Sequence, residues 1–389
     1  MKHTTRTLFY RTAHATRAAL ALAVAAALGA APAGAHADPQ GLLESIHHHS
    51  TLINTVPDNG DQNPYAIAVA PVSAGTVKQG DVLVDNFNNA ANLQGTGSTI
   101  VDYHPDTQQM SLFASIPRDL KECPGGIGLS TSMTMLKSGW VIVGSTPSND
   151  GTTNTKGAGC LVVLDSSGKI ARTISSANIN DPWGNMAVVD HGDHAAVFVS
   201  NAGFGVGGTS GTGGEPPVSE HATVLRLDLD IPNGEAPVVR RETVVANGFG
   251  AQADKDVFLV GPTGLALSAD NKLLYVSDAI GNRINVIDDP LTRDTSAGVG
   301  RQLTADGLLR RPLAMVTTPQ GHLLVTNALN GQVVEIDPVA AKQLYARWID
   351  ADKAQTPPGS GDLFGIAMNP AGDGFYYVED DVNTLVLAH

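Results

Sequence analysis

The sequence predicts an all-β protein, a six-bladed β-propeller, and three observations favour this fold. Six segments repeat one order of short strands and turns, Gly and Pro are abundant at 42 and 22 residues, and only 16% of residues are charged. The predicted strands have about five residues each, and strands this short need neighbours on both sides to bury their faces. Four-stranded blades arranged around an axis provide those neighbours.

The repeating unit begins with Pro or Gly, then a variable and a small residue, then a short apolar strand and a turn. A β-branched strand ending in a small polar residue or Asp follows, then a polar loop and a third strand. The clearest copy is GPTGLALSADNKLLYVSDAIGNRINVID, residues 261–288. The other copies span residues 63–89, 125–145, 181–201, 311–338 and 361–389, and the first three resume at residues 98, 160 and 223.

A fourth, outer strand is expected in most units, for example at residues 110–116 and 342–349. The last unit reaches only its third strand at His389, whereas the segment STLINTV, residues 50–56, belongs to no unit. We therefore expect residues 50–56 to complete the C-terminal blade, which would close the ring and leave no exposed sheet edge. The predicted propeller domain is residues 63–389, preceded by an N-terminal segment at 38–62.

The N-terminal residues have the pattern of a secretory signal peptide. Residues 1–17 contain four bases and no acid, residues 18–30 are uncharged and apolar, and small residues stand at Ala35 and Ala37. This order predicts cleavage after Ala37, hence a signal peptide at 1–37 and a periplasmic or secreted product. The alternative is a retained anchor, but the apolar run is shorter than the roughly 20 residues of a membrane span.

The net charge of the chain indicates which kinds of partner it is expected not to bind. Without the four bases of residues 1–17, 20 Lys and Arg remain against 38 Asp and Glu, a net charge of −18. So acidic a chain repels phosphate groups, which argues against nucleic acid and anionic lipid surfaces as partners.

Two cysteines, Cys123 and Cys160, are present. An oxidising compartment favours a disulfide between them, and two buried free thiols are the alternative. Cys123 lies just before the first strand of the second unit and Cys160 at the start of its third strand, so both are expected at the same end of one blade.

Two rings of side chains are expected at one face of the propeller, the mouth face, where first strands begin and second strands end. The starts of the first strands are Tyr65, Ile127, Trp183, Thr263, Leu313 and Phe364. The ends of the second strands are Asn86, Ser145, Asn201, Asp278, Asn327 and Asp380.

An apolar floor with a polar rim is typical of a small-ligand site. We therefore predict ligand binding by Tyr65, Trp183 and Phe364 from the first ring, with a polar rim from the second; the rim residues are Asn86, Asn201, Asp278, Asn327 and Asp380. Two alternatives remain. The aromatic residues plug the channel as core, or the polar residues cap turns by bonding their own backbone.

The segment GPTGLALSADNKLLYVSD resembles NHL-type and YVTN-type propeller repeats. More widely, the chain resembles six-bladed propellers of the senescence-marker/gluconolactonase family and strictosidine-synthase-like proteins. The first family implies a divalent metal held by a Glu, two Asn at starts of first strands and an Asp at the end of a second strand. Asp278 matches that Asp and is the best metal-ligand candidate here, but the start-of-strand positions contain no Asn or Glu.

Four other motifs favour ordinary structural roles. GFGVGG at residues 203–208 matches a dinucleotide-binding pattern but lies in a Gly-rich loop with no helix after it. His47–His49 lack companion metal ligands, and His191 and His194 fall at a turn opposite the mouth face. DNGDQN at residues 58–63 lacks the spacing of a calcium loop.

The favoured function is therefore an exported module, more a binding or scaffold protein than an enzyme, with a small molecule or a protein at the channel mouth. The alternative is a metal-dependent hydrolase of the lactonase or esterase type. No cofactor is certain, and Ca²⁺ or another divalent metal is the one considered. Nothing in the sequence singles out a haem or quinone site.

Overall fold

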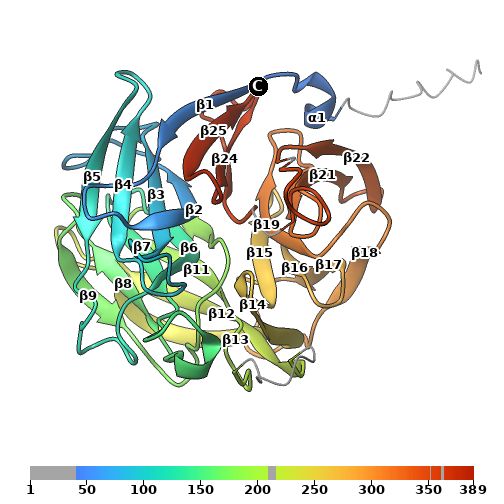
Figure 1. The fold of residues 1–389 in the computed structure, drawn as a ribbon. Helices are drawn as coiled ribbons and strands as arrows, with labels where there is room; N and C mark the ends of the chain where they lie inside the picture. The colour runs from blue at the N-terminus through green and yellow to red at the C-terminus, as the bar shows by residue number, and fades with distance from the viewer. Residues whose placement is uncertain (1–40, 209–215, 351, 361–362) are drawn as a thin grey trace, which may run out of the picture. The chain divides into compact units, whose positions relative to one another are not determined.

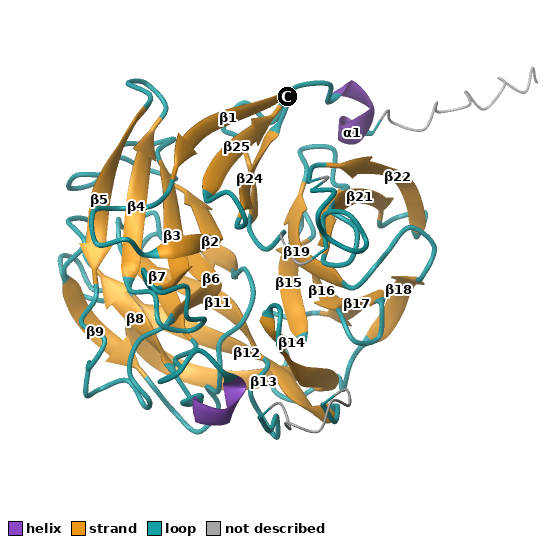
Figure 2. Cartoon of the chain, in the orientation of Figure 1, coloured by secondary structure: helices purple, strands orange, loops and turns teal. Residues whose placement is uncertain are grey.

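The structure, a computed structural model, describes residues 41–208, 216–350, 352–360 and 363–389, so the expected signal peptide lies outside the described residues. Within these ranges, strands β1–β25 form six antiparallel sheets, accompanied by the short helices α1 (Leu42–Ser45) and η1 (Thr153–Thr155). Figures 1 and 2 show the sheets as blades of a propeller, which confirms the predicted fold. No helix among the described residues is long and apolar enough to cross a bilayer.

The first three blades follow the N-terminal strand β1 (His49–Asn54). Blade one contains β2 (Gln62–Val69), β3 (Val82–Asn88), β4 (Thr99–His104) and β5 (Gln109–Ser115). Blade two contains β6 (Leu129–Met135), β7 (Val141–Ser145), β8 (Cys160–Leu164) and β9 (Ile170–Ile174). Blade three contains β10 (Ala187–Asp190), β11 (His194–Asn201), β12 (Ser219–Asp230), β13 (Val238–Asp254) and β14 (Phe258–Val260).

The remaining blades are more regular. Blade four contains β15 (Pro262–Leu267), β16 (Leu273–Asp278), β17 (Arg283–Asp288) and β18 (Arg301–Ala305). Blade five contains β19 (Pro312–Thr317), β20 (Leu323–Asn327), β21 (Gln332–Asp337) and β22 (Lys342–Trp348). Blade six contains β23 (Ile366–Met368), β24 (Phe375–Glu379) and β25 (Thr384–Ala388), with β1 as its outer strand. The first strand of each blade lies innermost.

The N-terminal segment closes the ring, as predicted. Strand β1 pairs antiparallel with β25, from His49 opposite Ala388 to Asn54 opposite Thr384. Figure 1 shows β1, in blue, beside the red C-terminal strands. The inner strand β2 of blade one in turn contacts β23 and β24 of blade six. Both ends of the chain therefore contribute to one sheet.

A buried carboxylate also fastens the N-terminal segment to blade five. The backbone N–H groups of Leu42 and Leu43 donate to Glu335 Oε1 and Oε2, each at 2.8 Å. Glu335 is fully buried and lies 2.8 Å from His322 Nδ1. Residues 42–54 thus join blade five to blade six, and two free N–H groups at the start of α1 find a charged acceptor.

Blade three differs from the repeat, because the sequence does not predict its fifth strand. Strand β13 is 17 residues long and changes register against β12 several times, then turns back into β14. The tip of this β13–β14 hairpin, residues 255–257, reaches the mouth face.

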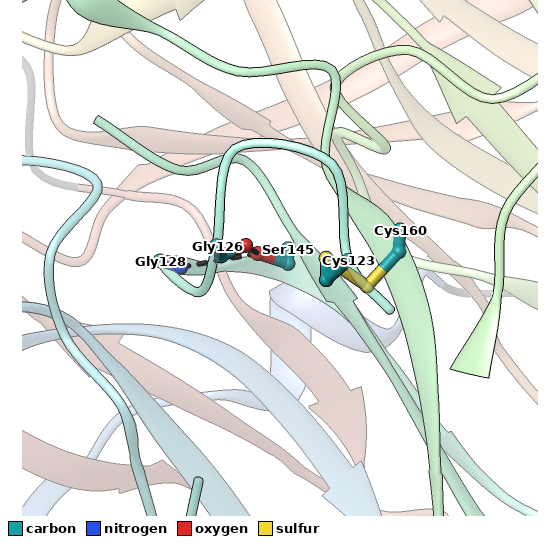
Figure 3. Close-up of a disulfide and its surroundings, with 5 residues drawn as sticks. All are labelled: Cys123, Gly126, Gly128, Ser145 and Cys160. Carbon is teal, nitrogen blue, oxygen red and sulfur yellow. Dashed lines mark hydrogen bonds between the residues drawn. A yellow bond between two sulfur atoms is a disulfide. The ribbon is translucent and has the colours of Figure 1, made fainter. Parts of the chain in front are cut away.

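The two cysteines form a disulfide at one end of blade two, with their Cα atoms 5.3 Å apart (Figure 3). This is the pairing and the placement that the sequence predicts. Beside it, Gly128 N–H donates to Ser145 Oγ, which donates to Gly126 O. The bridge spans 37 positions and stabilises the folded chain by about 3–4 kcal/mol in the chain-entropy model.

Removal of residues 38–56 tests the closure of the ring. The deletion should lower the midpoint of thermal unfolding of the whole propeller, because it exposes the edge of β25 and removes the two N–H donors of Glu335. A control deletion of residues 38–40, which keeps α1 and β1, should unfold like the parent. Equal midpoints for all three proteins would show that closure by β1 is unimportant.

Candidate functional site

The middle of the propeller is filled by five aromatic side chains, here called the aromatic plug: Tyr65, Phe87, Trp183, Phe258 and Phe364. Each is at most 1% exposed. The ring of Tyr65 stacks between those of Phe87 and Phe364, with centroids 4.5 and 4.1 Å away. Trp183 meets the same three rings edge-on at 5.6 to 6.1 Å. Such contacts stabilise a core beyond the area they bury.

Phe258 enters the plug from the β13–β14 hairpin. Its ring centroid lies 5.6 Å from that of Phe87 and 6.4 Å from that of Trp183. Its backbone φ is +67°, a left-handed conformation that is costly for a bulky side chain. Packing in the plug therefore holds this residue in place against local strain.

The predicted floor residues Tyr65, Trp183 and Phe364 do come together, but inside this plug. They are shielded from solvent, as the core alternative expects, and their contact with a ligand stays a prediction. The other start-of-strand residues, Ile127, Thr263, Leu313, are buried too, and Thr263 Oγ1 donates to Gly261 O. These positions offer no set of oxygen ligands, so they do not fit the metal that the gluconolactonase resemblance implies.

Most side chains of the second ring, at the ends of the second strands, form hydrogen bonds with other parts of the chain. Asn86 bonds Thr55, Asn327 Oδ1 accepts from Arg310 N–H, and Asn201 Oδ1 accepts from Asn180 N–H. Asp278 accepts from Gly281 N–H and from Arg283 Nε, each close to 2.8 Å. These side chains fix the loops of the mouth face, and an arginine already neutralises the best metal-ligand candidate. Their binding of a ligand stays a prediction; among the predicted rim residues, Asp380 lines the cavity described below.

In four blades, the side chain of the residue that precedes the second-ring position also hydrogen-bonds to the backbone of the chain. Asp85 Oδ1 accepts from Ala66 N–H at 2.8 Å, and Ser200 Oγ donates to Trp183 O. Ser277 bonds Gly264 N–H and Leu313 O, and Thr326 Oγ1 donates to Leu363 O at 2.9 Å. Burial raises the pKa of Asp85 well above its ordinary value, although the Ala66 and Tyr65 N–H groups act in the opposite direction. These side chains satisfy the irregular backbone where first strands begin.

A cavity of about 770 Å³, here called the mouth cavity, opens on the mouth face. Asn63 lines it two residues before Tyr65, and Val257 lines it next to Phe258, so the cavity lies beside the segments that lead into the plug. A separate cavity of about 350 Å³ is lined by first-strand residues of every blade, such as Ile67 and Met133. The plug therefore lies between the two along the first strands.

The lining of the mouth cavity consists largely of amides and carboxylates. The amides are Gln62, Asn63, Asn88, Asn92, Gln94, Gln355 and Asn383, and the acids are Asp254, Asp256, Asp380 and Asp381. Lys255 and Arg311 are the cations in the described lining. Arg311 pairs with Asp254 at 2.9 Å, so the acids outnumber the available positive charge.

Two carbonyl oxygens in this lining have no hydrogen-bond donor: Asn88 Oδ1 and Gln355 Oε1. The amide nitrogen of each donates a hydrogen bond, that of Asn88 to Asn92 Oδ1 at 2.8 Å and that of Gln355 to Asp381. Asn88 is 2% exposed. Leaving such an acceptor unpaired costs about 1–3 kcal/mol, and a donor on a ligand would recover it.

The remaining sequence motifs have structural contacts. Asp61 of the 58–63 turn accepts from Ser98 N–H and from Thr99 Oγ1, which fixes this segment to β4. His49 Nδ1 lies 3.0 Å from the Tyr377 hydroxyl. The rings of His191 and His194 stack in the β10–β11 turn. The described part of the Gly-rich loop, residues 203–208, contains no helix.

The fold and these cavities define the class of protein: a six-bladed β-propeller with a filled channel and a polar mouth cavity. Among solved structures it is similar to a gluconolactonase from Xanthomonas campestris, at 13% identity over 88% of each chain with a TM-score of 0.53. It is also similar to a luciferin-regenerating enzyme, at 12% identity over 88% of this chain and 94% of the other, with a TM-score of 0.54.

A third neighbour is assigned as a gluconolactonase, with 14% identity over 89% of this chain and 92% of the other and a TM-score of 0.51. At these identities the likeness shows the fold. No family model matches the sequence, and no curated protein matches it. The structural neighbours are thus gluconolactonase-like propellers, as the resemblance read from the sequence predicts.

Replacing Trp183 by Ala tests whether the plug is core. The change should lower the free energy of unfolding by about 3–5 kcal/mol, as expected for emptying a packed aromatic site. The control, Trp348→Ala, removes a side chain that is 62% exposed and should change stability little. Urea unfolding of both variants is the measurement. A loss for Trp183→Ala no larger than that for Trp348→Ala would exclude the plug as core.

Proposed function

We propose that this protein binds a small, hydroxyl-rich ligand in the mouth cavity. The observation that carries the proposal is a cavity lined by seven amide side chains and four carboxylates, two of whose amides, Asn88 and Gln355, have a carbonyl oxygen without a partner. A hydroxyl group both donates and accepts, so a ligand with several O–H groups can bond the carboxylates and carbonyl oxygens as well as the amide N–H groups of this lining. Sugars, sugar lactones and polyols are of this kind.

The charged side chains of the cavity lining further limit the types of ligand that it can bind. Four acids face it against Lys255 and Arg311, and Arg311 is already paired with Asp254. An anion would be repelled by the excess of carboxylates, so we infer a neutral or positively charged ligand. The volume of about 770 Å³ lies in the range of small-molecule sites.

Hydrolysis of a sugar lactone in the same cavity is the second candidate. It is favoured by the neighbours, one of which is a gluconolactonase and another assigned as one. The first ring does not supply the metal ligands of that family, so the cavity acids Asp254, Asp380 and Asp381 are the groups available to act on such a substrate.

We also infer that the site works in the periplasm or outside the cell. The basis is the signal-like pattern of residues 1–37 together with the disulfide, since disulfides persist in oxidising compartments. A mature protein whose N-terminal sequence begins at Met1 would overturn this inference.

Calorimetric titration with glucono-1,5-lactone, glucose and sorbitol, together with an assay of lactone hydrolysis, tests the function. Asn88→Ala should weaken binding about tenfold, because one buried hydrogen bond to the ligand is lost. The control is Asn233→Ala, an exposed amide in the β12–β13 loop outside the cavity. Binding without turnover supports a binding protein, and turnover that Asn88→Ala slows supports the hydrolase. Failure of all three compounds to bind or react would contradict both candidates.

A further inference from the structure

A second polar cluster lies in blade one, at the end of its strands away from the mouth face. Asp81 immediately precedes β3, and Asp102 and His104 are two residues apart on β4, so their side chains point to the same face of the sheet. One ligand atom from each of the three lies within 4.8 Å of the others. No other group of three or more His, Cys, Asp or Glu residues among the described residues meets this criterion.

The cluster is built into the interior. The side chains of Asp81 and Asp102 are 4% and 2% exposed, and that of His104 is 20% exposed. His104 Nδ1 lies 2.8 Å from Asp81 Oδ2 and 3.8 Å from Asp102 Oδ2. Both carboxylates therefore face one imidazole nitrogen, and His104 leaves a single edge of the cluster open to solvent.

Asp102 is the observation that points to a ligand. Its Oδ1 is buried and has no hydrogen-bond partner, and its Oδ2 lies 3.8 Å from His104 Nδ1. Two carboxylates buried this close to one another repel each other when both are charged. A divalent cation would neutralise both and would give Asp102 a partner.

The second imidazole nitrogen is arranged as in metal-bound histidines. His104 Nε2 lies 3.2 Å from Ser111 Oγ on the neighbouring strand β5. When Nε2–H donates to that hydroxyl, Nδ1 carries the lone pair and can bind a metal. Asp81 Oδ2 is likewise oriented, because it accepts from Lys78 N–H at 2.8 Å.

We propose that Asp81, Asp102 and His104 Nδ1 bind a divalent transition metal of the zinc type. An imidazole and two carboxylates suit Zn²⁺ better than Ca²⁺, which prefers oxygen ligands alone. Ligand atoms about 2.0–2.2 Å from a tetrahedral zinc lie about 3.3–3.6 Å from one another. His104 Nδ1 and Asp81 Oδ2, now 2.8 Å apart, would therefore separate slightly, and Asp102 Oδ2, 3.8 Å from Nδ1, would move closer. Water would complete the coordination on the open edge. The site lies at the opposite end of β3 from Asn88 of the mouth cavity, and the proposal does not depend on the function assigned to that cavity.

Zinc titration of the chelator-treated mature protein by calorimetry is the test. The parent should bind one Zn²⁺ with a rise in the unfolding midpoint, because the ion binds the folded state. Asp102→Asn keeps the shape of the side chain and removes its charge; it should fold, as far-ultraviolet circular dichroism would show, and bind zinc at least about 100-fold more weakly. Ser111→Ala, which frees Nε2, should weaken binding about 10-fold or more.

Two control variants separate this site from the other histidines. His48→Ala alters the N-terminal histidine run and His194→Ala alters the stacked pair at the β10–β11 turn, and both should bind zinc as the parent does. The proposal is wrong if the parent binds no stoichiometric zinc, or if Asp102→Asn binds it with the affinity of the parent. Loss of binding in either control, with Asp102→Asn unaffected, would place the ion at that histidine instead.

Discussion

The first strands of the six blades converge around one axis, and the space between them must be filled either by side chains or by water. In this protein that constraint is met by the aromatic plug, to which β2, β3, β14 and the starts of blades three and six contribute side chains. Close packing of large rings stabilises the centre of the fold. It also closes the channel, so that chemistry at the mouth face has to take place above the plug, among the loops.

The loops are held by the polar residues that end the second strands. Their recurrence in every unit looks like a ring of ligands when it is read along the sequence. In space, Asn86, Asn201, Asp278 and Asn327 use their oxygens and nitrogens on the chain itself. A buried backbone without regular strand pairing needs such partners, so a repeated small polar residue first indicates a repeated backbone requirement. The proposed ligand site, the mouth cavity, is instead lined by residues that differ from blade to blade.

The difference between features that repeat in every blade and features that occur in one blade explains which parts of the structure the sequence could predict. The number of blades, the closure by residues 50–56 and the pairing of Cys123 with Cys160 follow from repeats and strand direction, which are local patterns. The mouth cavity does not, because Asn88 ends β3, Arg311 precedes β19 and Gln355 lies between β22 and β23, positions that share no repeated pattern. Nor does the β13–β14 hairpin, since its irregular register against β12 obscures the alternation that marks a strand. The contact of Glu335 with α1 joins residues nearly 300 positions apart, and no periodic signal marks it.

Hydrogen exchange at the indole N–H groups tests most directly whether the plug closes the channel. The protein has three tryptophans, and the signal of Trp183 can be assigned by comparison with Trp183→Phe. Its Nε1–H is fully buried with no acceptor, whereas Trp348 is 62% exposed and serves as an internal reference. If the plug is core, the Trp183 N–H should exchange only on unfolding of the propeller, orders of magnitude more slowly than that of Trp348. Exchange of Trp183 as fast as that of Trp348 would show an open channel and contradict its closure by the plug.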